Sequence, residues 1–426
     1  MSLSDRDLKV LWHPYTQMKT AKAPIGIVRG EGAWLYDEDG NGYLDAISSW
    51  WVNTVGHSNP HIAEKVAEQL KTLEHVLFAG FTHPKAVELA ERLLKVLPKN
   101  QARIFLSDNG STAVEVAIKM TLQYWSNKGI KKNKIIAFNG SYHGDTFGAM
   151  SISGRGAFVA PFESLLFDVD FIDVPVSGKE EVSLSQLNEI IEKQKDNIAA
   201  FIYEPLIQGA SGMIMYEPEA LDDLLKICRS NSILTIADEV MTGFGRTGKF
   251  FASEYMSIDP DILCMSKGIT GGTMALGATS SSAAMYDAFY ADDKLKTFFH
   301  GHSYTANPVA CSAACASLDI YDEKETWIAV ERIGIQHLNF AKRLEGFDSI
   351  KDVRCRGTII AIELNTDEGT SYFSNIRDSI YDYFIAKRII LRPLGNIIYI
   401  LPPYVISEED LNLVYDAIIE FFENKS

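Results

Sequence analysis

The chain has 426 residues, a formal net charge of -16 at pH 7 and an isoelectric point near 5.1. Hydrophobic residues make up 46% and charged residues 23%, which excludes wholesale disorder. The acidic balance disfavours a nucleic-acid partner, because such binding needs a basic patch, and the length predicts more than one substructure.

No secretory signal or membrane span is expected. Residues 1–10 alternate charged and polar residues without an apolar core. The uncharged stretch 268–286 is dominated by Gly, Ser, Thr and Ala, so we expect packed loop and strand there and no membrane partner. The 5 scattered cysteines do not resemble a disulfide framework, which favours a cytoplasmic location.

The first sixty residues predict a small β-rich lobe, with a short aromatic strand at 33–36 and turn signals at 39–42. Further along the chain, helical patterns separate a series of short apolar runs. These runs lie at 104–106, 135–138, 199–203, 233–237 and 262–264. The alternation predicts an α/β fold with a mostly parallel central sheet.

The pattern changes again beyond about residue 316. An amphipathic helix is expected as far as about residue 344, then strands near 358–364 and 397–401, and a final helix from residue 408. We therefore predict a large domain of residues 61–315. A smaller α+β domain would be built from both termini, residues 1–60 and 316–426.

Two predicted strand ends carry groups that suit pyridoxal phosphate. Lys267 follows the run 261–264, and Asp238 ends the preceding strand. A lysine amine forms a Schiff base with the cofactor aldehyde, while a carboxylate keeps the pyridine nitrogen protonated. A solvated lysine is the ordinary alternative, but the glycines at 268, 271 and 272 indicate a tight site where a desolvated amine loses basicity.

Two turns after predicted strands offer further cofactor contacts. Residues 106–112 precede a helix that is expected to run to about Trp125, and a helix N-terminus binds phosphate; a simple N-cap turn is the alternative. In the turn 139–144, Tyr142 is suited to stacking on the cofactor ring or to covering the sheet edge. His143 is a candidate base or metal ligand, but no metal-binding spacing accompanies it, so no metal is expected.

The glycine-rich stretch 243–248 satisfies GxGxxG, yet no helical pattern follows it and no acidic residue lies at the required distance. A dinucleotide site is therefore rejected. Arg246 within it could bind a carboxylate or lie exposed in solvent.

Arg392 could bind a substrate carboxylate or form a surface salt bridge. Tyr15 and Trp51 could wall an apolar substrate chain or belong to the core.

The stretch 237–248, together with residues 266–268, resembles the class III aminotransferases of fold type I, and the likeness extends over nearly the whole chain. The resemblance implies pyridoxal 5'-phosphate as the cofactor. Lys267 would form the Schiff base and shuttle the proton, Asp238 would pair with the pyridine nitrogen, and Tyr142 would cover the ring. Gly110 and Ser111 would hold the phosphate.

The resemblance also implies a homodimer with shared active sites. The segment 300–303 would reach the neighbouring subunit's site, with Ser303 as phosphate donor and Gly301 beside the substrate. Ser303 stands where threonine is usual and His302 where proline is expected. The remaining substrate-binding positions implied by the family are Tyr15, Trp51, Arg246, Arg392 and Tyr399, with Arg392 as the carboxylate anchor.

Residues 11–18 and 48–51 resemble the subfamily that aminates 8-amino-7-oxononanoate in biotin biosynthesis, with S-adenosylmethionine as donor. Ala210 stands where relatives that use glutamate carry a gating glutamate, so glutamate is not expected as donor. Lysine stays open as the donor. The alternatives are a class III enzyme acting on ω-amines, ornithine or γ-aminobutyrate, and a non-catalytic cofactor-binding protein.

Overall fold

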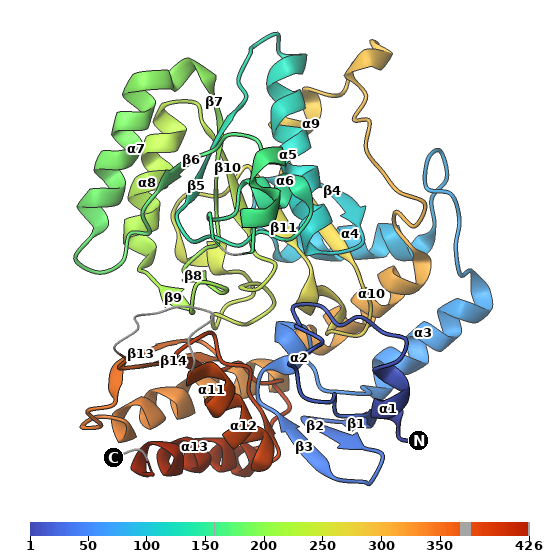
Figure 1. The fold of residues 1–426 in the computed structure, drawn as a ribbon. Helices are drawn as coiled ribbons and strands as arrows, with labels where there is room; N and C mark the ends of the chain where they lie inside the picture. The colour runs from blue at the N-terminus through green and yellow to red at the C-terminus, as the bar shows by residue number, and fades with distance from the viewer. Residues whose placement is uncertain (157, 367–375, 425–426) are drawn as a thin grey trace.

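The computed structural model describes residues 1–156, 158–366 and 376–424. Its large lobe is built on seven strands. They are β4 (Gln101–Ser107), β5 (Lys134–Phe138), β6 (Asp170–Ile172), β7 (Ile198–Tyr203), β10 (Leu234–Asp238), β11 (Ile262–Met265) and β12 (Gly277–Ser282). Their order in the sheet is β4-β12-β11-β10-β7-β5-β6 (Figure 1). All five predicted apolar runs are strands of this sheet, which is confirmed as mostly parallel; only β12 runs antiparallel to its neighbours.

Helices cover both faces of the sheet because its strands carry apolar side chains on both faces. Ile135 and Ala137 of β5 belong to one core cluster with α5 (Gly110–Asn127), while Ile136 and Phe138 belong to the other with α8 (Pro218–Ser230). This alternation follows from the two-residue period of a strand. α8 buries Leu221, Leu224, Leu225 and Cys228 on one face, and α7 (Glu180–Gln194) packs beside it (Figure 1). Because helices pack against both apolar faces of the sheet, the positions of the sheet and of its strand ends are fixed.

A second lobe brings the two ends of the chain together. One sheet combines β1 (Ile27–Glu31), β2 (Trp34–Asp37) and β3 (Gly42–Asp45) with β15 (Ile389–Ile390), and another consists of β13 (Ile350–Arg356), β14 (Ile359–Leu364) and β16 (Ile397–Ile400). Leu44 of β3 pairs in parallel with Ile389 of β15. The N-terminal strands and the C-terminal helices α12 (Ile376–Ala386) and α13 (Glu408–Glu423) share the lower half of Figure 1. The exact division into domains stays a prediction.

The single amphipathic helix predicted as far as residue 344 is wrong. The structure has two helices, α10 (Pro308–Asp322) and α11 (Lys324–Arg343), separated by the extended backbone of Glu323. The break follows from their different environments. α10 is buried nearly all round against α3 (Pro60–Thr72) and α4 (Pro84–Val96), whereas α11 buries one face against β13 and β14.

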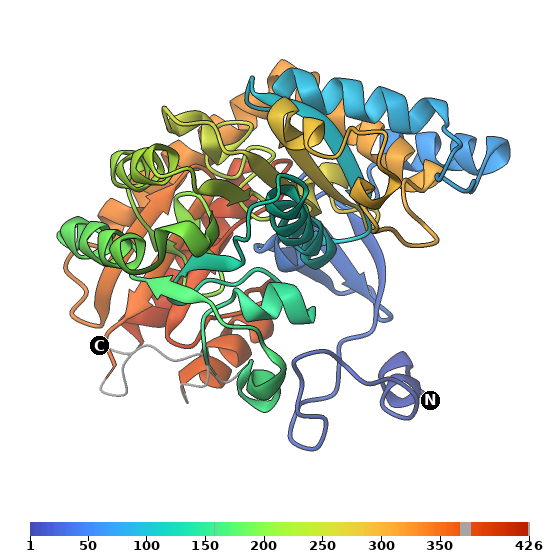
Figure 2. The same ribbon diagram turned by 90° about the horizontal axis from the view of Figure 1, so that it is seen from above.

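Two further features concern the surface. Figure 2 shows the segment before β1, including α1 (Leu3–Asp7), projecting from the side of the molecule, and Trp12 within it is 88% exposed. Within the described ranges, no helix combines the length and apolar composition that a membrane span requires.

Candidate active site

A cavity of about 650 Å³ lies at the carboxyl edge of the central sheet. Parallel strands end at a common edge, so side chains from distant parts of the sequence meet there. The loops after β5, β7, β10 and β11, the N-terminus of α5 and the short helix α2 (Ser48–Trp51) supply its walls. Among the predicted residues, the cavity is lined by Lys267, Asp238, Tyr142, Gly110, Ser111 and Trp51.

Lys267 begins a short 3-10 helix (η4, Lys267–Thr270) directly after β11. Its φ of 48° is left-handed, a strained conformation that favours glycine and clusters at functional sites. The amine lies 4.8 Å from the centre of the Trp51 ring. Desolvation lowers the pKa of Lys267 to about 8, against the opposing charges of Asp238 and Glu204. Lys267 is half-buried, and its amine faces the cavity beside the Trp51 ring.

Asp238 ends β10 and faces the cavity. Its Oδ2 lies 2.7 Å from Nδ1 of His143, and its Oδ1 accepts a hydrogen bond of 3.1 Å from the N–H of Val240. The other ring nitrogen of His143 is buried and has no partner among the described residues. His143 therefore orients Asp238. Across residues 1–156, 158–366 and 376–424, no group of three or more His, Cys, Asp or Glu could hold a metal ion.

The start of α5 forms a cradle for an anion. The Asn109 side chain accepts from the N–H of Thr112 at 2.9 Å, so both the predicted N-cap turn and the predicted helix start are confirmed. The N–H groups of Gly110 and Ser111 remain at the positive end of the helix, where an anion is stabilised. A Cβ at residue 110 would lie 2.8 Å from Cγ1 of Val240, so glycine is required for this close approach.

Tyr142 is joined to the N-terminal segment through a hydroxyl cluster. The Tyr15 hydroxyl donates to the Asp145 carboxylate and lies 3.3 Å from the Tyr142 hydroxyl. Burial raises the pKa of Tyr142 far above its ordinary value, so this phenol stays protonated. Asp145 also lines the cavity, although sequence reasoning did not single it out. The only feature of the sequence that could have indicated Asp145 as a site residue was its position three residues after Tyr142.

Trp51 forms one wall with support from behind. Its indole N–H donates to the Tyr399 hydroxyl at 3.0 Å. Arg246 is only 1% exposed and donates to the carbonyl of Pro402 at 2.8 Å and to that of Trp51 at 3.4 Å. The alternative of a solvated Arg246 is therefore wrong. Neither Arg246 nor Tyr399 lines the cavity, and both hold Trp51 in place.

Arg392 lies two residues after β15. Its guanidinium is 4.7 Å from the centre of the Trp50 ring, which in turn meets the Tyr15 ring edge-on at 5.5 Å. Among the described residues, no ion pair to Arg392 is found, so the predicted alternative of a surface salt bridge stays a prediction. This stacked arrangement leaves the guanidinium edge able to bind a carboxylate.

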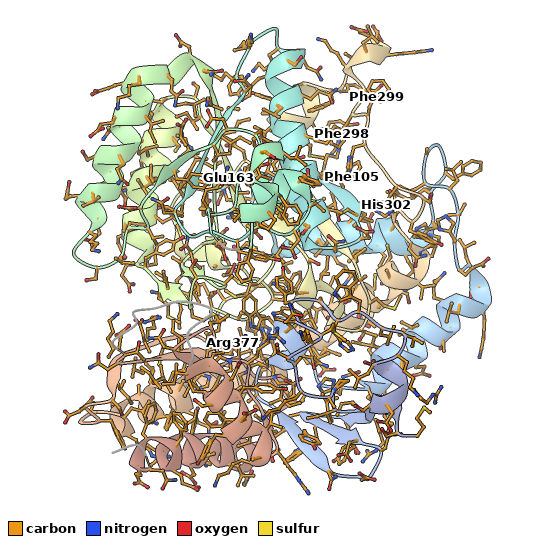
Figure 3. All side chains as sticks on the ribbon, in the orientation of Figure 1. Phe105, Glu163, Phe298, Phe299, His302 and Arg377 are labelled. Carbon is orange, nitrogen blue, oxygen red and sulfur yellow. The ribbon has the colours of Figure 1, made fainter. Side chains whose placement is uncertain are left out.

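The segment 300–303 lies away from this cavity. Gly301 and Ser303 are exposed between α9 (Ala283–Asp287) and α10, and neither lines the cavity. In Figure 3, His302 of this segment and Phe298, which precedes the segment, lie on the same side of the large lobe as Phe105 of β4. Phe105 and Phe298 meet edge-on at 5.3 Å. Within one subunit, Gly301 and Ser303 are therefore not brought to the other site residues.

The fold and the cavity define a pyridoxal-phosphate-dependent aminotransferase of fold type I. Residues 15–422 match the family model described as aminotransferase class-III, and the chain belongs to that family. The residues present fit the cofactor, because a lysine of low basicity, a carboxylate and a helix N-terminus surround one cavity. When bound there, the cofactor supplies an electron sink for chemistry at the amino-bearing carbon.

Among individual relatives, the chain is 45% identical over 97% of its length to adenosylmethionine-8-amino-7-oxononanoate aminotransferase of Synechococcus elongatus, covering 98% of that protein. It is 36% identical to the enzyme of the same name from Staphylococcus aureus, over 96% of this chain and 94% of that one. The crystal structure of the enzyme of that name from Methanocaldococcus jannaschii matches with a TM-score of 0.94 at 36% identity, over 99% of this chain and 98% of that one. An amine transaminase from an uncultivated Pseudomonas species matches with a TM-score of 0.92 at 32% identity, over 97% and 98%.

Proposed function

We propose that the protein transfers an amino group from S-adenosylmethionine to 8-amino-7-oxononanoate, giving 7,8-diaminononanoate for biotin biosynthesis. The names of the full-length relatives from bacteria and an archaeon support this choice of substrates. The observation that carries the proposed chemistry is the low-basicity amine of Lys267, which lines the same cavity as Asp238.

Five residues would hold the cofactor and prepare the reaction. The N–H groups of Gly110 and Ser111 would bind the phosphate, and Asp238 would hold the proton at the pyridine nitrogen. Tyr142 would cover one face of the ring. Lys267 would accept the proton from Cα of the amino donor, because its pKa of about 8 leaves an appreciable fraction of the amine uncharged at neutral pH.

The rim of the cavity would select the substrates. Arg392, which stacks on Trp50 outside the cavity lining, would bind the carboxylate of the oxononanoate, while Trp51, which lines the cavity, would flank its apolar chain. The Asp145 carboxylate suits a cationic group on a substrate. Tyr399 and Arg246 would act through Trp51, which both contact directly.

We also propose a cytoplasmic homodimer in which Gly301 and Ser303 serve the partner's cavity. Large apolar side chains are exposed around this segment, including Phe299 at 68% and Tyr304 at 66%, and a second copy would cover them. The absence of disulfides among the described cysteines agrees with a reducing compartment. Sedimentation of the purified protein at twice the chain mass would support the dimer, and a monomer would contradict it.

The test of the activity is Lys267→Ala in the cofactor-loaded enzyme. We expect loss of the visible absorbance of the lysine-bound cofactor and of turnover with the oxononanoate acceptor. Near-normal turnover would refute the role of Lys267. The likeness to the amine transaminase favours a second candidate, an enzyme acting on ω-amines. A panel comparing S-adenosylmethionine, lysine, ornithine and γ-aminobutyrate as donors, each read by bleaching of the absorbance band, separates the two.

A further inference from the structure

A second buried carboxylate, Glu204, lies in the cavity wall directly after β7. It is 6% exposed and follows a strand whose six residues are all buried. One oxygen accepts from the N–H of Tyr142 at 3.0 Å, and the other accepts from the N–H of Gly209 at 3.0 Å. Within the described ranges, no lysine or arginine forms an ion pair with it.

These two bonds join a loop that lines the cavity to a turn that packs behind Trp51 and Met241. Tyr142 belongs to the loop after β5, whereas Gly209 belongs to the turn between β8 (Ile207–Gln208) and β9 (Ile214–Met215). Gly209 packs so closely that a Cβ there would lie 3.0 Å from the Trp51 ring and 2.6 Å from Sδ of Met241. Glu204 therefore connects the tyrosine wall to the surface on which Trp51 rests.

The two hydrogen-bond donors determine whether the ionised or the protonated form of the Glu204 carboxyl group fits the site better. Both partners are N–H groups, so the ionised carboxylate, which accepts through both oxygens, suits them best; in a protonated carboxyl group the hydroxyl oxygen is a weaker acceptor, and neither partner accepts its O–H. Burial opposes ionisation and raises the pKa of Glu204 to about 7. The titratable groups that face Glu204 are His143, Asp238 and Lys267, and the Tyr216 hydroxyl donates to the main-chain carbonyl of Glu204.

We propose that Glu204 is a positioning residue that, when ionised, ties Tyr142 to the Trp51 wall and supplies a second negative charge beside Lys267. This role rests on the proposed function. It makes two separable contributions. The paired hydrogen bonds set the width of the cavity, and the charge favours the protonated state at the Lys267 nitrogen.

The test compares Glu204→Gln and Glu204→Asp in the cofactor-loaded enzyme, using the pH midpoint of the visible absorbance band. Gln preserves the shape but removes the charge and turns one acceptor into a donor, so the midpoint should fall on the order of one unit. Asp preserves the charge but is one methylene shorter, so its midpoint should stay near that of the wild type while turnover falls roughly tenfold, the cost of one misplaced contact.

The matched control is Glu239→Gln. Glu239 is also a fully buried carboxylate that accepts main-chain N–H groups, those of Ala252 and Ser253, but it does not line the cavity. This variant should lose thermal stability without moving the midpoint. An unchanged midpoint in Glu204→Gln, or an equal shift in Glu239→Gln, would overturn the proposal.

If Glu204→Gln does not fold, the test of the positioning role relies on Glu204→Asp alone. Wild-type turnover in Glu204→Asp overturns the positioning role, and a loss with the midpoint retained supports it. The midpoint is measured without substrates, so it is independent of whether the oxononanoate is the true acceptor. A wild-type enzyme inactive with that acceptor would contradict the proposed function and leave the midpoint test intact.

Discussion

The amine of Lys267 should react far faster than other lysines at neutral pH, even before the cofactor is bound. Its pKa is lowered from 10.5 to about 8 because the side chain is desolvated. At pH 7.5 about a quarter of such amines are uncharged, against about one in a thousand for an ordinary lysine. The structure therefore predicts a rate advantage of roughly 200-fold if both amines are equally accessible.

Reductive methylation of the cofactor-free protein with formaldehyde and cyanoborohydride tests this prediction directly. Peptide mass spectrometry gives the extent at each lysine between pH 6 and 10, and Lys226 is the internal control, because its hydrogen bond to Asp223 raises its pKa. The Lys267 profile should have its midpoint near pH 8. Asp238→Asn should move the midpoint lower, because the Asp238 charge supports the protonated amine. A midpoint above about pH 9.5 would refute the argument from desolvation.

Two further predictions concern the substrate and the stability of the fold. Arg392→Ala should lower kcat/KM for the oxononanoate by about 100-fold, because a charge-assisted hydrogen bond is worth about 3 kcal/mol. The same variant should barely change kcat/KM for a small uncharged ketone. Equal losses with both acceptors would contradict the anchoring role. Burial lowers the pKa of His337 to about 3, so the folded state resists protonation that the unfolded state accepts below about pH 6.5. Stability should therefore be lost as the pH falls from 6.5 towards 3, by about 5 kcal/mol in total. In His337→Asn the melting temperature should decline less steeply over this pH range. A decline as steep as that of the wild type would show that His337 is not the cause of the loss of stability.

The sequence predicted five of the seven strands of the central sheet because each of these five is a short apolar run with its own boundaries; β6 (sequence DFI) and β12 (sequence GATSSS) carry no such run. It also identified Lys267, Asp238 and the start of α5, since all three follow such runs. Local patterns could not predict the break at Glu323. Its cause is the change from the buried environment of α10 to the one-sided packing of α11.

The environments of three charged side chains also depend on distant residues. Arg246 is buried because carbonyls from residues 51 and 402 surround it. Asp145 meets Tyr15, and Glu204 meets Tyr142 and Gly209, only after folding. One signal for Glu204 was present, because a carboxylate directly after a wholly apolar strand must find donors or lose its charge. The sequence alone did not say which donors.

The pairing of β3 with β15 has a consequence for how the enzyme matures during synthesis. The first partner, Leu44, is translated 345 residues before the second, Ile389. Arg392 and its stacking surface on Trp50 therefore cannot come together until the ribosome has passed residue 392. A truncated product could retain the lysine and the cradle at the start of α5, yet it would lack the group that we propose to recognise the acceptor.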